Sequence, residues 1–508
     1  MIWLVATILV PVFAALGCLA TVKHARLNRI VGVLGACMLL PVSAMLVMDV
    51  LNNGYVVVQS GDWEAPFGIT LVADMLSALM VAVTAVIAST VAIYSLKDIG
   101  DELHESHYFA LFHFLLLGVN GAFVTGDLFN LYVWFEVMLL SSFVLMTFGG
   151  KREQLEGGVK YLVINLVSSV LFLSSIGLIY GKLGTLNMAD IAVRLAESPD
   201  ALVVKSSAML MLAAFGIKAA MFPFFFWLPA SYHTPNIAIS ALFAGLLTKV
   251  GVYALLRSYT LIWGIHFEVV QDIFIILAAG TMISGVLGAA AQFDIRKILS
   301  FHIISQIGYM IMGLAIGTPL AIAGAIFYTI HHIIVKANLF LIGGLVIRKC
   351  GSSHLSETGG LYKYSPALAL LFFIPAFSLG GIPPLSGFWA KFSVVKAGLD
   401  AGHYLLVFSA IVVGVLTLFS MTKIWAEAFW KPLPEEAKNE RPSLGKPLAL
   451  SLVLPCATLA VLTLLIGLWS EPLFVAAQIA SEQLLDSDAY IEAVLNGDAN
   501  PMETATND

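Results

Sequence analysis

The sequence predicts an all-α polytopic membrane protein with about 14 transmembrane helices. Its 508 residues are 59% hydrophobic and only 11% charged, and the mean hydropathy is +0.93. Apolar runs of about 20 residues, long enough to cross a bilayer, recur along the chain. The basic residues between these runs are concentrated in alternate loops. This composition excludes an ordinary water-soluble globular protein.

The apolar runs follow one another with short polar connections. Their approximate positions are 1–22, 30–50, 70–95, 107–126, 128–149, 160–182, 206–229, 237–258, 271–291, 299–317, 320–347, 366–396, 403–425 and 447–470. No basic residue precedes the first run, and Lys23, Arg26 and Arg29 follow it. A secretory signal peptide has the opposite arrangement, so we expect the first run to remain as a helix.

The distribution of basic residues predicts the orientation in the membrane. If the N-terminus faces outward, sixteen Lys and Arg residues lie in or beside the cytoplasmic loops. The outer loops then hold only Lys182, Arg194, Lys205 and Arg257. Cytoplasmic loops carry the excess of positive charge, so both termini are predicted to lie outside. The acidic tail from Glu471 onward is expected to be a short solvated extension.

Two of the runs contain prolines that interrupt a helix, and this suggests an internal repeat. Pro223 falls in the seventh run, and Pro383 and Pro384 fall in the twelfth. Proline lacks the backbone donor and clashes with the preceding turn. The two interrupted helices are five apart, an odd number, so matching blocks would be inverted, as in many transporters. Predicted divisions are 1–106 (helices 1–3), 107–258 (first inverted repeat), 271–425 (second) and 426–508 (a cytoplasmic loop, helix 14 and the acidic tail).

Charged residues lie in the middle of several apolar runs. A charge at the bilayer centre costs about 2.5–3.5 kcal/mol even on lenient scales, so such residues ordinarily line a functional interior. Glu136 needs a partner from another helix, and Lys218 is the first candidate. Lys249 is expected to relay protons from Lys218, because its own helix offers it no acceptor. The alternative for Glu136 and Lys218 is a static ion pair that locks two helices.

The second half carries histidines and lysines at comparable depth. His332 and Lys336 are spaced i, i+4 and share a helix face. Histidine titrates near neutral pH and suits a proton shuttle, although a hydrogen-bonded core histidine is an equal alternative. Lys391 follows the second break, where freed backbone carbonyls could also hold it structurally.

Other titratable residues are predicted to lie outside the path. Lys396 and Lys423 lie near helix ends, where lysines extend toward the interface. His113 and His302 are expected to be satisfied core histidines. His331 is adjacent to His332 and points in another direction.

Motifs for cofactors and metals are missing from the sequence. There is no P-loop, no dinucleotide fingerprint and no cysteine cluster for an iron–sulfur centre. The four cysteines have no metal-ligand spacing, and Cys350 is expected in a cytoplasmic loop. We therefore expect no cofactor, no metal site and no nucleic-acid partner.

Four segments together resemble one family of membrane proteins. They are LYVWFEVMLLSS with Glu136, FGIKAAMFPFFFWLP with Lys218, LLTKVGVYALLR with Lys249, and GGIPPLSGFWAKF with Lys391. The chain resembles the antiporter-like subunits that respiratory complex I shares with Mrp cation/proton antiporters. The resemblance implies that Glu136 and Lys218 form a proton-pumping pair, Lys249 is the central relay and Lys391 is the terminal lysine. It also implies a hetero-oligomeric complex in a prokaryotic plasma membrane.

The expected function is proton translocation within a multi-subunit antiporter that exchanges monovalent cations, most simply Na⁺, for H⁺. Such a chain is a component of a transporter and not an enzyme in itself. The alternative is a proton-pumping subunit of NADH–quinone oxidoreductase or of a membrane-bound hydrogenase, whose redox centres would lie in other chains. A third possibility is a membrane scaffold whose buried charges have no role.

Overall fold

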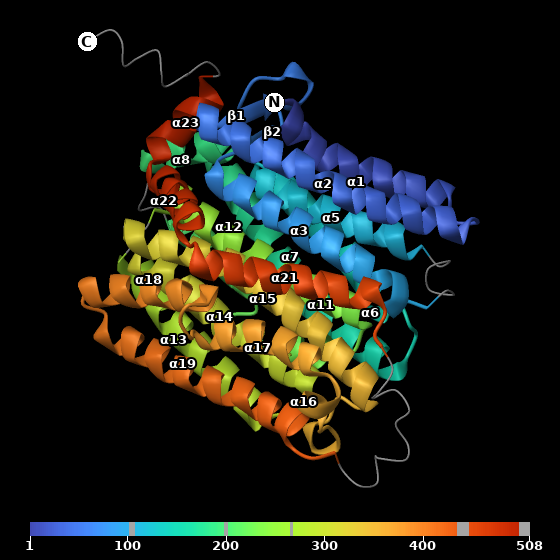
Figure 1. Ribbon diagram of the computed structural model, residues 1–508. Coiled ribbons are helices and arrows are strands. Elements are labelled where there is room, and N and C mark those ends of the chain that lie inside the picture. Colours follow the sequence, from blue (N-terminus) through green and yellow to red (C-terminus); the bar gives the residue numbers. More distant parts are fainter. Residues whose placement is uncertain (101–106, 198–201, 265–267, 434–446, 497–508) are drawn as a thin grey trace.

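Parallel and antiparallel helices form a slab in the computed structural model, which describes residues 1–100, 107–197, 202–264, 268–433 and 447–496 (Figure 1). Twelve of the described helices are long and apolar enough to cross a membrane. The sequence predicted 14 spans. The difference arises because the runs at 107–126 and 366–396 contain shorter apolar helices, Tyr108–Val124 and Pro366–Gly380.

The N-terminal third is built from long apolar helices and one small hairpin. These elements are α1 (Ile2–Ala20), α2 (Ala25–Asn53), β1 (Val56–Gln59), η1 (Ser60–Asp62), β2 (Thr70–Ala73), α3 (Met75–Asp98), α5 (Tyr108–Val124), α6 (Leu128–Thr147), α7 (Arg152–Leu183) and the short α8 (Met188–Ala196). Strands β1 and β2 pair antiparallel, with Val56 opposite Ala73. The prediction of a purely α-helical chain missed this hairpin, because its strands are only four residues long.

The middle of the chain builds the centre of the slab. Its helices are α9 (Leu202–Ala219), α10 (Trp227–Ser231), α11 (Ile237–Gly245), α12 (Leu247–Leu261), α13 (Glu268–Ala291), α14 (Ile295–Ile316) and α15 (Pro319–Cys350). Helix α15 packs against α3, α11, α14, α17, α18, α21 and α22. Nearly every residue of α12 and α15 is buried, polar ones included, so these two helices lie inside the slab.

The C-terminal third closes the slab and returns to the first helices. Its elements are η2 (Leu355–Glu357), α16 (Leu361–Tyr364), α17 (Pro366–Gly380), α18 (Ser386–Asp400), α19 (Tyr404–Trp425), η3 (Ala426–Trp430), α21 (Leu450–Leu468), α22 (Glu471–Leu485) and α23 (Ser487–Leu495). Cys350, expected in a loop, is instead the buried last residue of α15.

The acidic C-terminal segment is helical over its described part, contrary to the prediction of a solvated extension. Helix α22 packs against α15, α3 and α12, and α23 packs against α8. Gln483 accepts a hydrogen bond from the Met75 backbone amide at 2.8 Å and donates one to the Gly54 carbonyl at 2.8 Å. Small and apolar side chains supply the buried face of α22, and the acidic residues occupy the other face.

Helical structure ends where the prolines predicted an interruption. Helix α9 ends at Ala219, and the next helix is a single turn that begins at Trp227. Helix α17 ends at Gly380, and α18 begins at Ser386, beyond Pro383 and Pro384. Gly381 has φ of +90°, a left-handed value that glycine adopts without steric cost.

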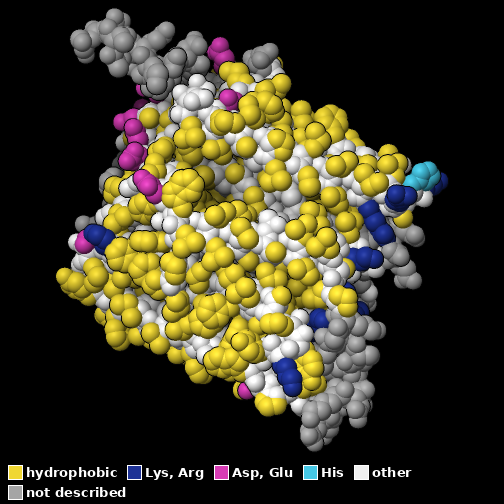
Figure 2. All heavy atoms as spheres, in the orientation of Figure 1, with side chains coloured by type: hydrophobic (Ala, Val, Ile, Leu, Met, Phe, Trp, Pro, Cys, Tyr) yellow, Lys and Arg dark blue, Asp and Glu magenta, His cyan; other side chains and the backbone are white. Residues whose placement is uncertain are grey.

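One face of the molecule is mainly hydrophobic between two charged rims (Figure 2). Lys and Arg side chains gather at the right-hand end of the helices in this view, and Asp and Glu gather at the upper left, over the C-terminal helices. Figure 1 shows the N-terminus and α23 at this acidic end.

Candidate functional site

Glu136 lies in the middle of α6 and is half-buried. Its Oε1 atom accepts a short hydrogen bond from the Ser169 hydroxyl on α7, the helix that packs beside α6. The sequence predicted a partner from another helix, and the structure supplies Ser169, which sequence reasoning did not single out. The hydroxyl provides one donor to a carboxylate that would otherwise face an apolar wall.

Lys218 occupies the last turn of α9 and is only 4% exposed. Its ammonium lies 4.9 Å from the ring centre of Phe135, the residue that precedes Glu136. The lysine therefore approaches the same turn of α6 as the glutamate. Within the described residues, however, no ion pair joins Lys218 to Glu136, so the static ion pair considered from the sequence is not formed in this structure.

Lys249 is fully buried at the start of α12. Its ammonium donates a short hydrogen bond to the carbonyl of Ala244, in the preceding helix α11. Ala244 and Lys249 belong to the same predicted run, 237–258, so the expectation that this run offers the lysine no acceptor is wrong. The reason is local: α11 ends at Gly245, and a turn at Leu246 separates it from α12. The lysine thus has a backbone partner within its own span.

Gly251 brings Lys218 and Lys249 onto neighbouring segments. A Cβ atom at this position would lie 2.6 Å from the amide nitrogen of Ala219 and 2.9 Å from the carbonyl carbon of Lys218. Only glycine permits such a close approach between α12 and the end of α9. The two lysines that the sequence placed in succession are therefore on helices in direct backbone contact.

His332 and Lys336 lie on α15, and both are completely buried. Neither the ring nitrogens of His332 nor the ammonium nitrogen of Lys336 has a hydrogen-bond partner among the described residues. Thr248 on α12 and His302 on α14 carry further buried polar atoms without partners there. Helix α14 packs against both α12 and α15. Buried polar atoms are ordinarily satisfied by protein or by ordered water, so this set favours a hydrated interior.

The two other predicted core histidines differ from each other. The Nε2 atom of His113 lies 2.9 Å from the Gly32 carbonyl, whereas its Nδ1 atom has no partner among the described residues, so the expected core role is met at one ring nitrogen. Both nitrogens of His302 are buried without a partner among the described residues, so the prediction of a satisfied histidine is wrong there. The cause is its neighbourhood on α14, which faces the lysines and histidines of α12 and α15.

Lys391 is half-buried on α18, just beyond the second interruption. Its ammonium donates to the carbonyl of Gly380 at 3.1 Å and lies 5.2 Å from the ring centre of Tyr309. Because α17 ends at Gly380, that carbonyl is available to accept from Lys391. A backbone carbonyl that holds Lys391 in place is the structural alternative that the sequence left open. Pro383 and Pro384 lie between the lysine and its acceptor in the chain.

His331 connects the central helix to the second interruption. Its Nδ1 atom lies 2.8 Å from the hydroxyl of Ser386, the first residue of α18. The Ser386 hydroxyl is in turn 3.1 Å from that of Ser378 on α17. The sequence favoured His332 over His331, and no spacing within α15 distinguishes the two. Ser386, which directly follows Pro383, Pro384 and Leu385, is the sequence signal that could have distinguished His331 from His332.

Arg257 is the largest misassignment made from the sequence. It was counted in an outer loop, but it lies within α12 and is 3% exposed. Its guanidinium donates to the Asp74 carboxylate at 2.5 Å, and Asp74 is fully buried. The i, i+4, i+8 spacing of Lys249, Tyr253 and Arg257 places all three on one helix face and could have indicated this.

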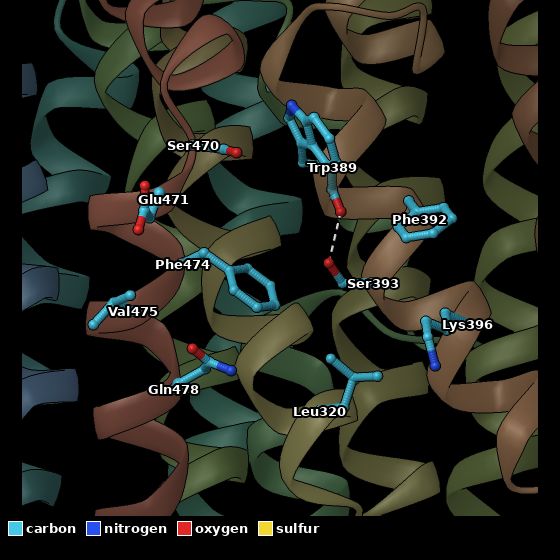
Figure 3. Close-up of a pocket in the computed structure, with 10 residues that line it drawn as sticks. All are labelled: Leu320, Trp389, Phe392, Ser393, Lys396, Ser470, Glu471, Phe474, Val475 and Gln478. Atoms are coloured by element: carbon cyan, nitrogen blue, oxygen red, sulfur yellow. Dashed lines mark hydrogen bonds between the residues drawn. The ribbon is translucent and has the colours of Figure 1, made fainter.

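Lys396 and Lys423 lie away from the buried set. Lys396 is exposed and pairs with Asp400 at 2.5 Å. It borders a surface groove of about 430 Å³ between α18, α22 and the start of α15 (Figure 3). Lys423 donates to the carbonyls of Ala290 and Gln292, at 2.8 and 2.7 Å. Neither lysine contacts Glu136, Lys218 or Lys249.

The described residues contain no group of three or more His, Cys, Asp or Glu side chains that could hold a metal ion. The chemistry available to the buried set is the gain and loss of protons by carboxylate, imidazole and amine.

Comparison with known proteins decides the family. Residues 125–417 match the transmembrane family described as NADH:quinone oxidoreductase/Mrp antiporter, and this range includes Glu136 and Lys391. The chain belongs to this family. It is 45% identical over 488 residues to the D-type subunit of the Na(+)/H(+) antiporter of Alkalihalophilus pseudofirmus, covering 96% of this chain and 98% of that one.

Solved structures agree with this assignment. A chain in the Mrp complex from Dietzia sp. DQ12-45-1b has 33% identity and a TM-score of 0.89, covering 97% of this chain and 100% of the other. A chain in the membrane-bound sulfane sulfur reductase, an archaeal respiratory membrane complex, has 25% identity and the same TM-score of 0.89, covering 97% and 99%. The fold is thus shared by an antiporter and a respiratory complex.

The comparisons confirm a finer resemblance already present in the sequence. GDWEAPFGITLVADMLSALMV, the ASYHTPN segment after the seventh run and HHIIVKANLFLIGG indicate the D-type subunit of Mrp antiporters within the family. The Alkalihalophilus pseudofirmus protein, which carries that name, matches almost the whole chain.

Proposed function

We propose that this chain is the proton-translocating membrane subunit of a multi-subunit Na⁺/H⁺ antiporter. The observation that carries the proposal is the buried set itself: Lys218, Lys249, His332 and Lys336 are each at most 4% exposed within spanning helices. Charged groups at such depth are costly and ordinarily serve an ion or proton path. The Alkalihalophilus pseudofirmus relative is named as a component of an Na(+)/H(+) antiporter, which supports sodium as the exchanged cation.

Protons pass between the two halves through one line of side chains in this proposal. Glu136 and Lys218 exchange a proton at the first interruption, and Lys249 is the relay beside the central helix. His332 and Lys336 continue the line on α15, and Lys391 is its last residue. Two like charges about 10 Å apart repel by about 1.7 kcal/mol at an effective dielectric constant near 20, so protonation of one lysine disfavours protonation of the next. A proton entering at one end therefore displaces one at the other.

The two interruptions belong to a pair of inverted repeats, 107–258 and 271–425. This proposal is supported by the positions of the breaks, after α9 and after α17, with α10 to α16 between them in the chain. Residues 1–106 and 426–508 then flank the repeats. Interrupted helices supply free carbonyls and amides at membrane depth, as in other secondary transporters.

The membrane is a prokaryotic plasma membrane, and both termini face outward in this proposal. Support comes from the charges at the two ends of the helices, basic at one end and acidic at the end that holds the N-terminus and α23. The positive-inside rule places the basic end in the cytoplasm. Partners are the other subunits of the antiporter, the surrounding lipid, and H⁺ and Na⁺ as transported ions.

A redox-driven complex is the second candidate function. The equal TM-score to a chain of an archaeal respiratory complex favours keeping it. The same proton line would then be driven by redox centres in other subunits, and no sodium exchange would be observed.

Antiport in everted membrane vesicles tests the proposal. The complete complex is produced in a host without its own antiporters, and cation-dependent proton movement is compared between wild type, Lys218→Ala and Lys391→Ala. We expect both variants to lose most activity while the complex still assembles. Normal activity in both assembled variants would refute the proton line. Proton movement that needs a reductant and not Na⁺ would favour the redox-driven complex.

A further inference from the structure

Helix α18 begins without a cap from its own N-terminal residue. Its N-cap position is Leu385, whose side chain makes no hydrogen bond to the backbone. The amide of Gly387 donates instead to the Ser378 hydroxyl at 3.1 Å, and Ser378 belongs to α17, on the other side of the interruption. The first amides of a helix have no partner within it, and the residue before the helix ordinarily supplies one. Here the other half of the broken span supplies it.

His331 on α15 joins this cap. Its Nδ1 atom lies 2.8 Å from the Ser386 hydroxyl, which is in turn 3.1 Å from that of Ser378. All three side chains are at most 1% exposed. The three helices are also in close contact at Gly387, where a Cβ atom would lie 1.8 Å from the Ser378 carbonyl oxygen and 3.0 Å from Nε2 of His331. The start of α18 is therefore held against both α17 and α15.

Two stacked tyrosines connect His331 to Lys391 on a second side. The ring of Tyr328 lies edge-on to His331, with 5.8 Å between ring centres, and stacks on Tyr309 at 5.1 Å. The Lys391 ammonium lies 5.2 Å from the centre of the Tyr309 ring. Both tyrosine hydroxyls are hydrogen-bonded, which fixes the two rings. A closed circuit of contacts thus runs from His331 through the tyrosines to Lys391 and back along α18 to Ser386.

We propose that His331 is a positioning residue that directs Lys391 toward the Gly380 carbonyl through the cap at the start of α18. The inference rests on the proposed function and adds to it how the last lysine of the proton line is placed on a broken span. Ser386 lies five residues before Lys391, about 7.5 Å along the same helix. Fixing the rotation of α18 at Ser386 therefore fixes the direction in which Lys391 extends.

The turn at the interruption makes this direction matter. The Lys391 ammonium donates to the Gly380 carbonyl at 3.1 Å. Its stem lies so close to the turn that a Cβ atom on Gly381 would be 2.9 Å from Cδ of the lysine. A rotation of α18 would press this stem into the turn or withdraw the ammonium from its acceptor. A small error at the cap is thus passed on to the charged group.

Removal of the Ser386 hydroxyl tests the cap. Ser386→Ala in the complete complex deletes the oxygen between His331 and Ser378 and keeps the packing. We expect cation-dependent proton movement in everted vesicles to slow about fivefold, the size expected for one lost hydrogen bond. Ser393→Ala is the matched control and should keep the wild-type rate, because Ser393 lies on the same helix, is 5% exposed and donates to the Trp389 carbonyl at 2.8 Å.

Two substitutions of His331 separate hydrogen bonding from volume. His331→Asn keeps a polar group near the position of Nδ1, so it should retain most of the rate. His331→Leu fills a similar volume without a polar atom, and it should slow proton movement about fivefold, as Ser386→Ala does. Rates are compared at matched levels of assembled complex, so that a loss of folding is not counted as a loss of rate.

Combination with Lys391→Ala distinguishes positioning from a general effect on packing. Two changes that act through the same side chain are not additive, whereas independent changes are. If His331 acts through Lys391, His331→Leu should slow the Lys391→Ala complex by less than about twofold. Ser386→Ala should behave in the same way in that background.

The outcomes separate this inference from the proposed function. Wild-type rates in assembled Ser386→Ala and His331→Leu would overturn the positioning role, and so would a full fivefold loss on top of Lys391→Ala. In both cases a slow Lys391→Ala complex leaves the proposed function intact. If Lys391→Ala and Lys218→Ala both keep the wild-type rate, the proposed function fails and the positioning role fails with it.

Discussion

The two interrupted regions hold their lysines in different ways. At the first, Lys218 lies over Phe135 near Glu136, a carboxylate in the middle of a spanning helix. At the second, Lys391 is held by the Gly380 carbonyl and the ring of Tyr309. In α14, α15, α17, α18 and α19 the only carboxylate is that of Asp400, which is exposed at the end of α18.

This difference assigns different tasks to the two halves. A positive charge in the first half can be balanced by Glu136, so charge pairs can form and separate there. Among the described residues, the positive charge of Lys391 meets a backbone dipole and an aromatic face, which stabilise it less than a full counter-charge does. In the proposed proton line, the first half can therefore hold a proton beside the Glu136 carboxylate, whereas the second half passes it between bases.

Replacing Glu136 by glutamine should have the largest effect, because it removes the carboxylate that distinguishes the first half. Positioned proton donors and acceptors are typically worth about 10²–10⁴-fold in rate, and we expect a loss of at least about a hundredfold in antiport. Glu136→Asp should keep part of the activity. Glu156→Gln on the exposed start of α7 is the control, and equal rates in Glu136→Gln and Glu156→Gln would remove the distinction between the halves.

Replacing Lys391 by alanine should cost less, about tenfold or more in antiport rate, because neighbouring bases still exchange protons. Lys396→Ala on the same helix should behave as wild type, since Lys396 is exposed and paired only with Asp400. The measurement is the initial rate of cation-dependent proton movement at matched complex levels. Equal losses in the two variants would contradict this assignment, because Lys391 would then contribute no more than the exposed Lys396.

Gly387→Ala tests the packing of the second interruption. A Cβ atom there would lie 1.8 Å from the Ser378 carbonyl oxygen, and also 3.0 Å from His331. Forcing extra atoms into a packed site costs about 1–3 kcal/mol, so the thermal midpoint of the solubilised complex should fall. Gly177→Ala on α7, where nothing lies within 4 Å, should leave the midpoint unchanged. An unchanged midpoint in Gly387→Ala would show that the interruption adapts easily.

Ser169→Ala should give the smallest change. It removes the hydroxyl that donates to Glu136, and a hydrogen bond of this kind contributes about 0.5–1.5 kcal/mol net. We expect antiport to slow a few-fold at most. Ser174→Ala, an exposed serine on the same helix that bonds only to the Val170 carbonyl at 2.8 Å, should have no effect. A loss as large as that of Glu136→Gln would move Ser169 into the proton line itself.

Hydropathy and proline positions were sufficient to predict most of the spanning helices and where two of them end. They were sufficient because a span of about 20 apolar residues and a proline without its N–H act locally. The sequence also predicted the burial of Glu136, Lys218, Lys249, Lys336 and His332. Which partner each one has could not be predicted, because Ser169, Phe135 and Gly380 are ordinary residues brought near by tertiary packing.

Arg257 and the C-terminal segment show the limit of such reasoning. A basic residue one turn from the end of a span is indistinguishable by hydropathy from a loop residue, and the partner that explains the burial of Arg257, Asp74, lies 183 positions away. Helices α22 and α23 escaped prediction because they are only 15 and 9 residues long, too short to be recognised as spans, and each carries two acidic residues.

Helix α15 has a mechanical consequence. Its 32 residues extend about 48 Å, well beyond the hydrocarbon thickness of about 30 Å. It contacts α11 from the first half of the chain and α14, α17 and α18 from the second half. Neither half can rock against it without shearing contacts on the same rod. In the proposed function, the proton line would thus cross a frame whose two halves share one central helix.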